Sequence, residues 1–122
     1  MKNVIITNNP IVAEKHDHVL FLDGSVEEIL IKVRDLVHEG YELISHPLPA
    51  SLRMMFSPFR SIIIGRKLES MNFLDAEIIE DSIIKFKNHM DFRKADTVNG
   101  DDYKKLDQLL LESAIKEQMA TW

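Results

Sequence analysis

The amino-acid sequence predicts a single α/β domain with flanking helices, one of them C-terminal, around a mixed, mostly parallel four-stranded sheet in a three-layer-like arrangement. Three observations lead to this fold class. Four short apolar runs before residue 70 are rich in β-branched residues, a capped helix separates the second run from the third, and the remaining chain carries helical periodicity. A length of 122 residues fits one domain. We therefore expect one domain over residues 1–122, with a sheet-forming part over 1–69 and a helical part over 70–122.

The first elements are a buried strand and a short helix. Residues 3–7 (Asn-Val-Ile-Ile-Thr) are typical of a buried strand that leaves the sheet through a turn. Asn8 or Asn9 can cap a helix that has Pro10 at its first position, because the first helical turn leaves its N–H groups unpaired and proline has none. Residues 19–22 (Val-Leu-Phe-Leu) predict the second strand.

The clearest structural signal covers residues 19–45. Ser25 and Glu28 have the Ser-x-x-Glu spacing of a capping box, in which each side chain bonds a free N–H of the first helical turn. Apolar residues then recur at helical spacing up to Gly40, which can end a helix in the left-handed conformation. Residues 41–45 predict the third strand. A strand–helix–strand unit of this kind favours two parallel strands joined by a right-handed crossover.

The fourth strand is predicted over residues 61–67, where three consecutive isoleucines indicate burial on both faces and a central position. The segment before it, residues 47–60, carries three prolines and shows no helical period. Because no helix precedes this strand, its direction stays open.

Two helices are predicted in the rest of the chain. Ser70 or Asn72 caps the first, which runs to about Met90. Its apolar stripe consists of Ile79, Ile83, Phe86 and Met90. After the polar residues 91–100, Asn99 or Asp101 opens the last helix. The buried face predicted for that helix consists of Tyr103, Leu106, Leu110 and Ala114.

Composition excludes several classes of function. The sequence has no cysteine, which rules out disulfides, thiol redox chemistry, a cysteine nucleophile and cysteine-based zinc sites. Its 15 basic and 20 acidic residues give a net charge of −5, which argues against a nucleic-acid partner. No apolar run approaches the roughly 18 residues of a membrane helix, and the N-terminus lacks a signal-peptide pattern. We therefore expect a cytoplasmic protein without a membrane partner.

The sequence assigns no cofactor, metal or catalytic residue. It contains no Gly-x-Gly-x-x-Gly run that could cradle a phosphate. The run His16-Asp17-His18 is more typical of a solvated loop than of a metal site. Asp23, Ser25 and His46 can be drawn as a catalytic triad, but no Gly-x-Ser-x-Gly elbow is present and Ser25 is better explained as a helix cap.

Polar residues follow each of the first three strands. If these strands are parallel, their carboxyl ends meet at one edge of the sheet, where ligands of α/β proteins bind. The N-terminus of the helix that Ser25 caps also points there and favours a negative charge. We expect a small carboxylate or phosphate, with the segment over residues 47–60 as a lid. The candidate ligand-binding residues are Asn8, Asn9, Asp23, Ser25, His46 and Arg60. Ordinary capping and turn roles remain the alternative for all of them except Arg60, whose expected role is that of a cation on the lid.

A run of large apolar side chains lies within the same proline-rich segment. It consists of Met54, Met55, Phe56 and Phe59. These side chains either fold back onto the core or form a contact patch for another protein or for a second copy of the chain. The last helix presents the same choice between covering the sheet and pairing with another subunit.

Four motifs together resemble the GrdX family. They are Ile-Ile-Thr-Asn-Asn-Pro (5–10), Asp-Gly-Ser (23–25), Val-Arg-Asp-Leu-Val-His-Glu-Gly (33–40) and His-Pro-Leu (46–48), and the likeness covers about residues 1–90. Members of that family are small proteins encoded beside the subunits of glycine, sarcosine and betaine reductases in amino-acid-fermenting anaerobes. The resemblance implies a non-enzymatic accessory or interaction protein whose partners are reductase subunits or itself. The alternative is a small enzyme or sensor that binds the anion described above.

Overall fold

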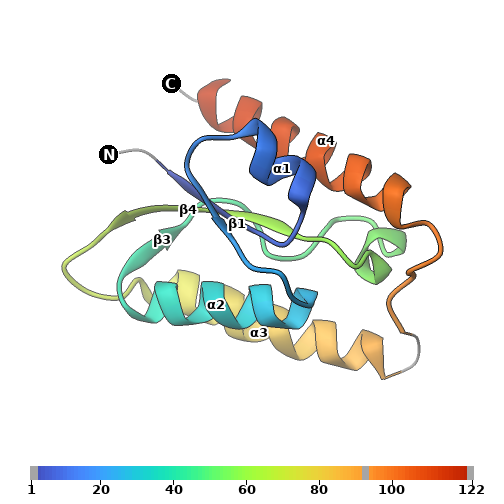
Figure 1. Cartoon of the computed structure of the whole chain (residues 1–122). Coiled ribbons are helices and arrows are strands. Elements are labelled where there is room, and N and C mark those ends of the chain that lie inside the picture. Colours follow the sequence, from blue (N-terminus) through green and yellow to red (C-terminus); the bar gives the residue numbers. More distant parts are fainter. Residues whose placement is uncertain (1–2, 92–93, 121–122) are drawn as a thin grey trace.

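The β-branched runs form one sheet with the strand order β2-β1-β4-β3 (Figure 1). The computed structural model describes residues 3–91 and 94–120, so residues 92 and 93 of the polar stretch and the two residues at each end of the predicted domain lie outside it. The strands are β1 (Val4–Thr7), β2 (Val19–Phe21), β3 (Tyr41–Leu43) and β4 (Ser61–Lys67). Each strand lies within the apolar run that predicted it.

The sheet is mixed, and the expectation that it is mostly parallel is wrong. β1 runs parallel to β2, but β4 pairs antiparallel with both β1 and β3. A parallel return after β3 would need a crossover of about a dozen residues, usually a helix. The proline-rich segment forms only the short 3-10 helix η1 (Arg53–Phe56). The chain therefore re-enters the sheet at the same end of the strands at which β3 leaves it, and β4 takes the predicted central position.

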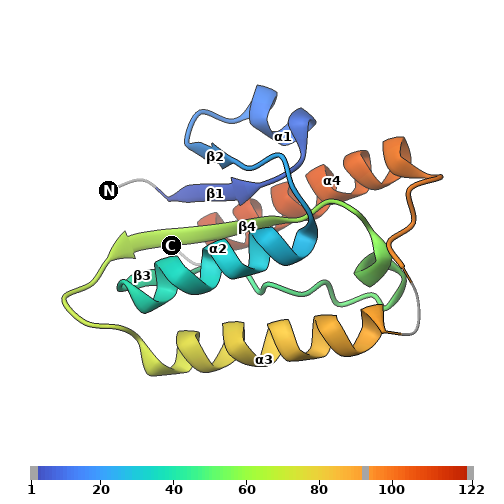
Figure 2. The ribbon, with the colours of Figure 1, turned by 60° about the horizontal axis from the view of Figure 1, so that its bottom comes forward.

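Helices cover both faces of the sheet. Figures 1 and 2 show α1 (Pro10–Lys15) and α4 (Gly100–Ala120) on one face, and α2 (Val26–His38) and α3 (Phe73–Met90) on the other. No helix in the described part of the chain is long and apolar enough to cross a membrane.

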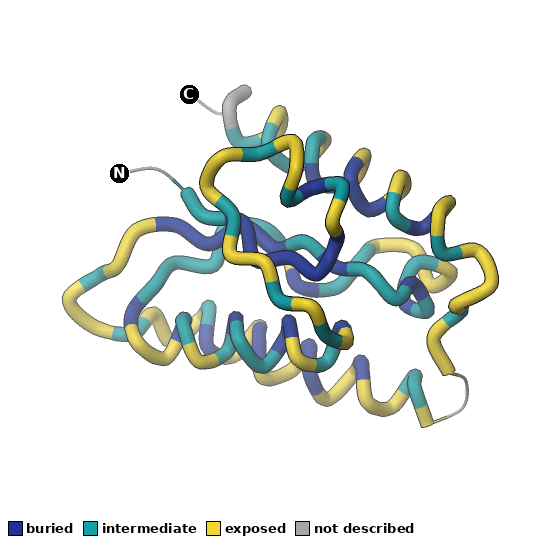
Figure 3. Tube along the Cα trace, viewed as in Figure 1, coloured by how far each residue is buried: buried dark blue, intermediate teal, exposed yellow. Residues whose placement is uncertain are grey.

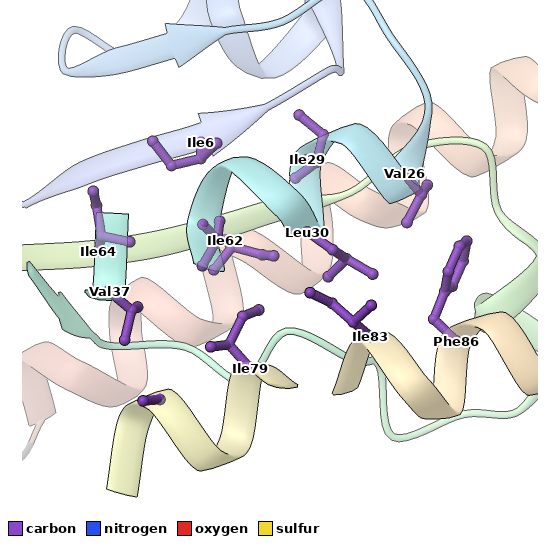
Figure 4. Close-up of a cluster of buried hydrophobic side chains, with 12 residues drawn as sticks. Ile6, Val26, Ile29, Leu30, Val37, Ile62, Ile64, Ile79, Ile83 and Phe86 are labelled. Carbon is purple, nitrogen blue, oxygen red and sulfur yellow. The ribbon is translucent and has the colours of Figure 1, made fainter. Parts of the chain in front are cut away.

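Alternation along β1 and β4 explains why three consecutive isoleucines are buried. Ile62 and Ile64 face α2 and α3 in the larger core cluster, which Figure 4 shows with the fully buried Leu30 and Ile79. Ile63 points to the opposite face and packs in a smaller cluster beneath α1 and α4. Burying one aliphatic side chain of this size contributes about 1.5–3 kcal/mol. In Figure 3 burial accordingly concentrates on the two central strands and on the inward faces of the helices.

The predicted helix boundaries are confirmed. Asn9 caps α1 with Pro10 in the first turn, and Ser25 and Glu28 form the reciprocal capping box of α2. Asn72 caps α3 by accepting a hydrogen bond from the backbone N–H of Asp75. Gly40 follows α2 with a φ of 113°, the left-handed conformation that glycine adopts without strain.

The buried face predicted for the last helix is only partly correct. Tyr103 is buried as expected, but Leu106 and Leu110 are 44% and 49% exposed. Asp107 and Leu111 take the inward positions instead. A hydrophobic pattern predicts that an aspartate in α4 faces solvent. In this fold Asp107 is buried, because it accepts hydrogen bonds from Asn9 and Ser61 at the ends of β1 and β4. α4 is thereby rotated, and part of its leucine stripe faces solvent.

Candidate functional site

Polar side chains gather where β1 ends and β4 begins. Thr7 of β1 lies opposite Ser61 of β4, and α4 packs across this end of the sheet. We name this group the edge cluster. Its members are Thr7, Asn8, Asn9, Arg60, Ser61 and Asp107. All of them are buried except Ser61, which is half-buried.

Asn8 joins three segments that are distant in the sequence. Its Oδ1 accepts a hydrogen bond from the backbone N–H of Arg60 at 2.9 Å. Its Nδ2 donates to the carbonyl oxygens of Gly24 and Pro58, both at 2.9 Å. The turn before α2 and the end of the proline-rich segment are thus fastened to the end of β1. Both amide N–H groups of Asn8 are used within the protein.

Asn9 joins the sheet to α4 while it caps α1. Its Oδ1 accepts from the backbone N–H of Ile11 at 3.1 Å. Its Nδ2 donates to the carbonyl oxygen of Lys104 at 2.8 Å and to Oδ2 of Asp107 at 3.1 Å. Because Asn9 is fully buried, these partners replace the water that its amide would otherwise bind.

Asp107 ends a chain of hydroxyl groups. Ser61 Oγ donates to Asp107 Oδ2 at 2.6 Å and lies 2.6 Å from Thr7 Oγ1. Since Ser61 has one hydroxyl proton and gives it to the carboxylate, Thr7 is the donor in the second bond. Burial raises the pKa of Asp107, and the hydrogen bonds from Ser61 and Asn9 and the charge of Arg60 partly oppose that rise.

Arg60 brings a buried cation beside that carboxyl group. Its Nη1 donates to the carbonyl oxygen of Pro47 at 2.9 Å, whereas its Nη2 is buried and has no hydrogen-bond partner among the described residues. Burial lowers the pKa of Arg60 to about 10, and the charge of Asp107 opposes the shift. Arg60 therefore remains charged at neutral pH, and its Nη2 is a buried donor without a partner among the described residues.

The edge cluster is suited to binding and to holding the strand ends, the neighbouring turns and α4 together by hydrogen bonds. A hydroxyl on a carboxylate could suggest a nucleophile, but the cluster has no histidine or lysine to serve as a general base near neutral pH. Most of its side-chain donors and acceptors are already hydrogen-bonded, to one another or to backbone groups of neighbouring segments. In the described part of the chain, no group of three or more histidine, aspartate or glutamate side chains could hold a metal ion.

The remaining predicted ligand-binding residues lie in the turns around this cluster. Asp23 and Ser25 are exposed, and Ser25 Oγ accepts the capping hydrogen bond from the backbone N–H of Glu28 at 3.2 Å. His46 is also exposed, and its Nδ1 accepts from the backbone N–H of Leu48 at 3.1 Å. The imidazole lines a cavity of about 270 Å³ together with Ala114 and Gln118 near the end of α4. The structure thus brings Asn8, Asn9 and Arg60 together, while His46 lies against another stretch of α4.

The four predicted interface side chains divide between core and surface. Met55 is 4% exposed and packs inside. Phe56 makes an edge-to-face contact with His89, with 6.5 Å between the ring centroids. Nζ of Lys104 lies 5.4 Å from the centroid of the Phe59 ring. Met54 is half-buried and lines an open groove.

That groove lies between η1 and the N-terminal half of α4, which adjoin each other in Figures 1 and 2. Its volume is about 550 Å³. We name it the η1–α4 groove. Its lining residues are Ser51, Arg53, Met54, Asn99, Asp102, Tyr103, Lys105, Leu106 and Leu109.

Sequence reasoning missed Thr7, Ser61 and Asp107 in the cluster and the α4 side of the groove. One signal was present: Asp107 lies four residues after Tyr103 and four before Leu111, so it shares a helical stripe with two large buried side chains. An acid in such a stripe indicates a polar partner on the facing element.

The comparisons with known proteins give one match. The family model described as GrdX-like protein matches residues 4–116, from the first residue of β1 into the last turns of α4. No curated protein and no solved structure matches the chain.

Proposed function

The chain belongs to the GrdX-like protein family, and on that premise we propose that it is a non-enzymatic accessory protein that binds a subunit of glycine, sarcosine or betaine reductase. The observation that carries this proposal is the extent of the family match, which includes every described strand and nearly all of α4. The bonded state of the edge cluster supports a structural role for it rather than a catalytic one, because most of its side-chain groups are already used within the fold. The apolar η1–α4 groove offers a surface for such binding.

The composition limits what the protein can do for a reductase. The 122 residues contain no cysteine, so they cannot themselves carry electrons on a thiol. The role left to them beside a thiol or selenol enzyme is to bind, assemble or regulate it.

Binding to purified subunits tests the proposal. Each subunit of the three reductases is immobilised separately, and the chain is titrated over it in a biolayer interferometry experiment. We expect saturable binding to at least one subunit and none to an unrelated acidic protein of similar size. If no subunit binds, alone or in its assembled complex, the accessory role is wrong.

One observation favours a second candidate function, the binding of a small anion. Nη2 of Arg60 is a buried cationic donor without a partner among the described residues, and a carboxylate or phosphate oxygen would satisfy it. The charge of Asp107 nearby opposes an anion. Thermal unfolding with phosphate, acetyl phosphate, glycine, sarcosine or betaine tests this candidate. A ligand at a hundredfold excess over its dissociation constant would raise the unfolding temperature by roughly 10 °C, and an unchanged temperature with all five would exclude binding of these compounds.

A further inference from the structure

The η1–α4 groove has an apolar floor between two positive charges. Met54, Leu106 and Leu109 supply the apolar surface, and the two leucines are 44% and 52% exposed. Arg53 stands on the η1 side and Lys105 on the α4 side. The groove therefore combines a surface that favours large apolar side chains with cations from both of its walls.

The two cations are available to an outside partner. Neither Arg53 nor Lys105 forms an ion pair with any of the residues that the structure describes. Asp102 also lines the groove and carries a negative charge in the first turn of α4, so the lining as a whole has one positive charge in excess. Two unpaired cations beside an apolar floor stand out in a chain whose net charge is −5.

The exposure of the leucines follows from the way α4 docks. The edge cluster draws Asp107 inward, and this rotation turns Leu106 and Leu109 toward solvent at the groove. Exposed leucines that adjoin one another beside a methionine are typical of a protein contact surface. A partner that covers these two leucines gains the free energy of burying apolar surface that stays exposed when the chain folds alone.

We propose that the η1–α4 groove binds a short, acidic, amphipathic segment of a partner protein. Large apolar side chains of that segment lie on Met54, Leu106 and Leu109, and its carboxylates lie beside Arg53 and Lys105. A volume of about 550 Å³ accommodates a few side chains of such a segment. The proposal rests on the accessory function above and names the surface and the chemistry of its partner.

Two synthetic peptides of equal length test the proposal. Both are amphipathic and carry leucine at the same helical spacing, but one has glutamate and the other lysine at the polar positions. Methyl-labelled methionine NMR follows the binding, because Met54 lines the groove whereas Met71 and Met90 pack against the core on the other side of the sheet. We expect the glutamate peptide to shift the Met54 methyl signal saturably and to leave the other two unchanged.

Substitutions at the groove sharpen the test. Leu109→Lys should weaken binding of the glutamate peptide by roughly tenfold, as the loss of a central apolar contact does. Arg53→Glu should weaken it by about threefold, a typical effect of one exposed charge pair. The matched control is Ile84→Lys, at a position of α3 that is 58% exposed and lies outside the groove, which should bind as the original chain does. Because all three positions are solvent-accessible, the Met71 signal should report an unchanged fold.

Three outcomes would overturn the proposal. They are an unmoved Met54 signal, equal binding of the lysine peptide, and a doubled mass in light scattering that Leu109→Lys abolishes, which would assign the groove to a second copy. The test also separates this proposal from the accessory function. If a reductase subunit binds the Leu109→Lys variant with full affinity, the groove assignment fails and the function stands. If the glutamate peptide binds and no subunit does, the function fails and the groove assignment stands.

Discussion

Replacing Asn9 by alanine measures how strongly the edge cluster holds the fold together. Asn9→Ala removes three hydrogen bonds: the cap of α1, the bond to the carbonyl oxygen of Lys104 and the bond to the carboxylate of Asp107. A helix cap contributes about 1 kcal/mol. The bond to a neutral carbonyl contributes about 1 kcal/mol, and the bond to a charged group about 2 kcal/mol. The expected loss in the free energy of unfolding is therefore about 4 kcal/mol.

The chain offers a matched control for this experiment. Asn72 caps α3 through the same type of bond, from the backbone N–H of Asp75 at 3.1 Å, but it is exposed and its side chain bonds no other element within the part of the chain that the structure describes. Asn72→Ala should lose only the cap contribution of about 1 kcal/mol. Urea unfolding followed by circular dichroism measures both variants, and the difference between them isolates the tertiary bonds of Asn9.

Equal losses for the two variants would refute the reasoning. That result would mean that the amide of Asn9 gains no stability from Lys104 and Asp107, and that α4 is held by its apolar contacts and by its other hydrogen bonds, such as the one from Ser61 to Asp107. A loss for Asn9→Ala of about 4 kcal/mol or more would instead show that the edge cluster is a principal attachment of α4 to the sheet.

Two further predictions concern the backbone after α2 and the pH dependence of stability. Gly40→Ala should destabilise the fold by about 1–3 kcal/mol, because φ is 113° and the new Cβ would lie 3.0 Å from the carbonyl oxygen of Leu68. Gly100→Ala, where a new Cβ has no atom within 4 Å, should change stability little, and an equal loss in urea unfolding would contradict the explanation. Burial raises the pKa of Asp107 above its ordinary value of 3.8, so the native state binds that proton more readily than the unfolded state does. The free energy of unfolding of the original chain should therefore rise relative to that of Asp107→Asn as the pH falls through the raised pKa toward 3.8. If urea unfolding gives the same difference in free energy between the two proteins across that pH range, the pKa of Asp107 is not raised.

Local features of the chain could be predicted because the residues that form them are close in sequence. The capping box of Ser25 and Glu28, the cap at Asn9 and the left-handed Gly40 each depend on a few neighbouring residues. The central strand β4 was predictable because three consecutive isoleucines need burial on both faces. These interactions are short-ranged, so they require no knowledge of the tertiary fold.

The direction of β4 stayed open at the level of the sequence, although the segment before it carries a relevant signal. That proline-rich segment could not form the helix of a crossover, and the lack of a helix favours an antiparallel return. The candidate site was predicted in part: Asn8, Asn9 and Arg60 do meet at one edge of the sheet. Their partner Asp107 could not be chosen among the many acidic residues of the chain, because it lies 98 residues from Asn9.

The sequence by itself determined the positions of the strands and helices, the helix ends and the exclusion of thiol chemistry from these residues. Only the tertiary structure decided which face of α4 is buried and hence where the η1–α4 groove lies. The physical reason is competition for the inward positions of that helix. Leu106 would gain free energy from burial, but the buried amide of Asn9 and the hydroxyl of Ser61 need a hydrogen-bond acceptor. Asp107 meets that need, and the leucines of α4 are left at the surface.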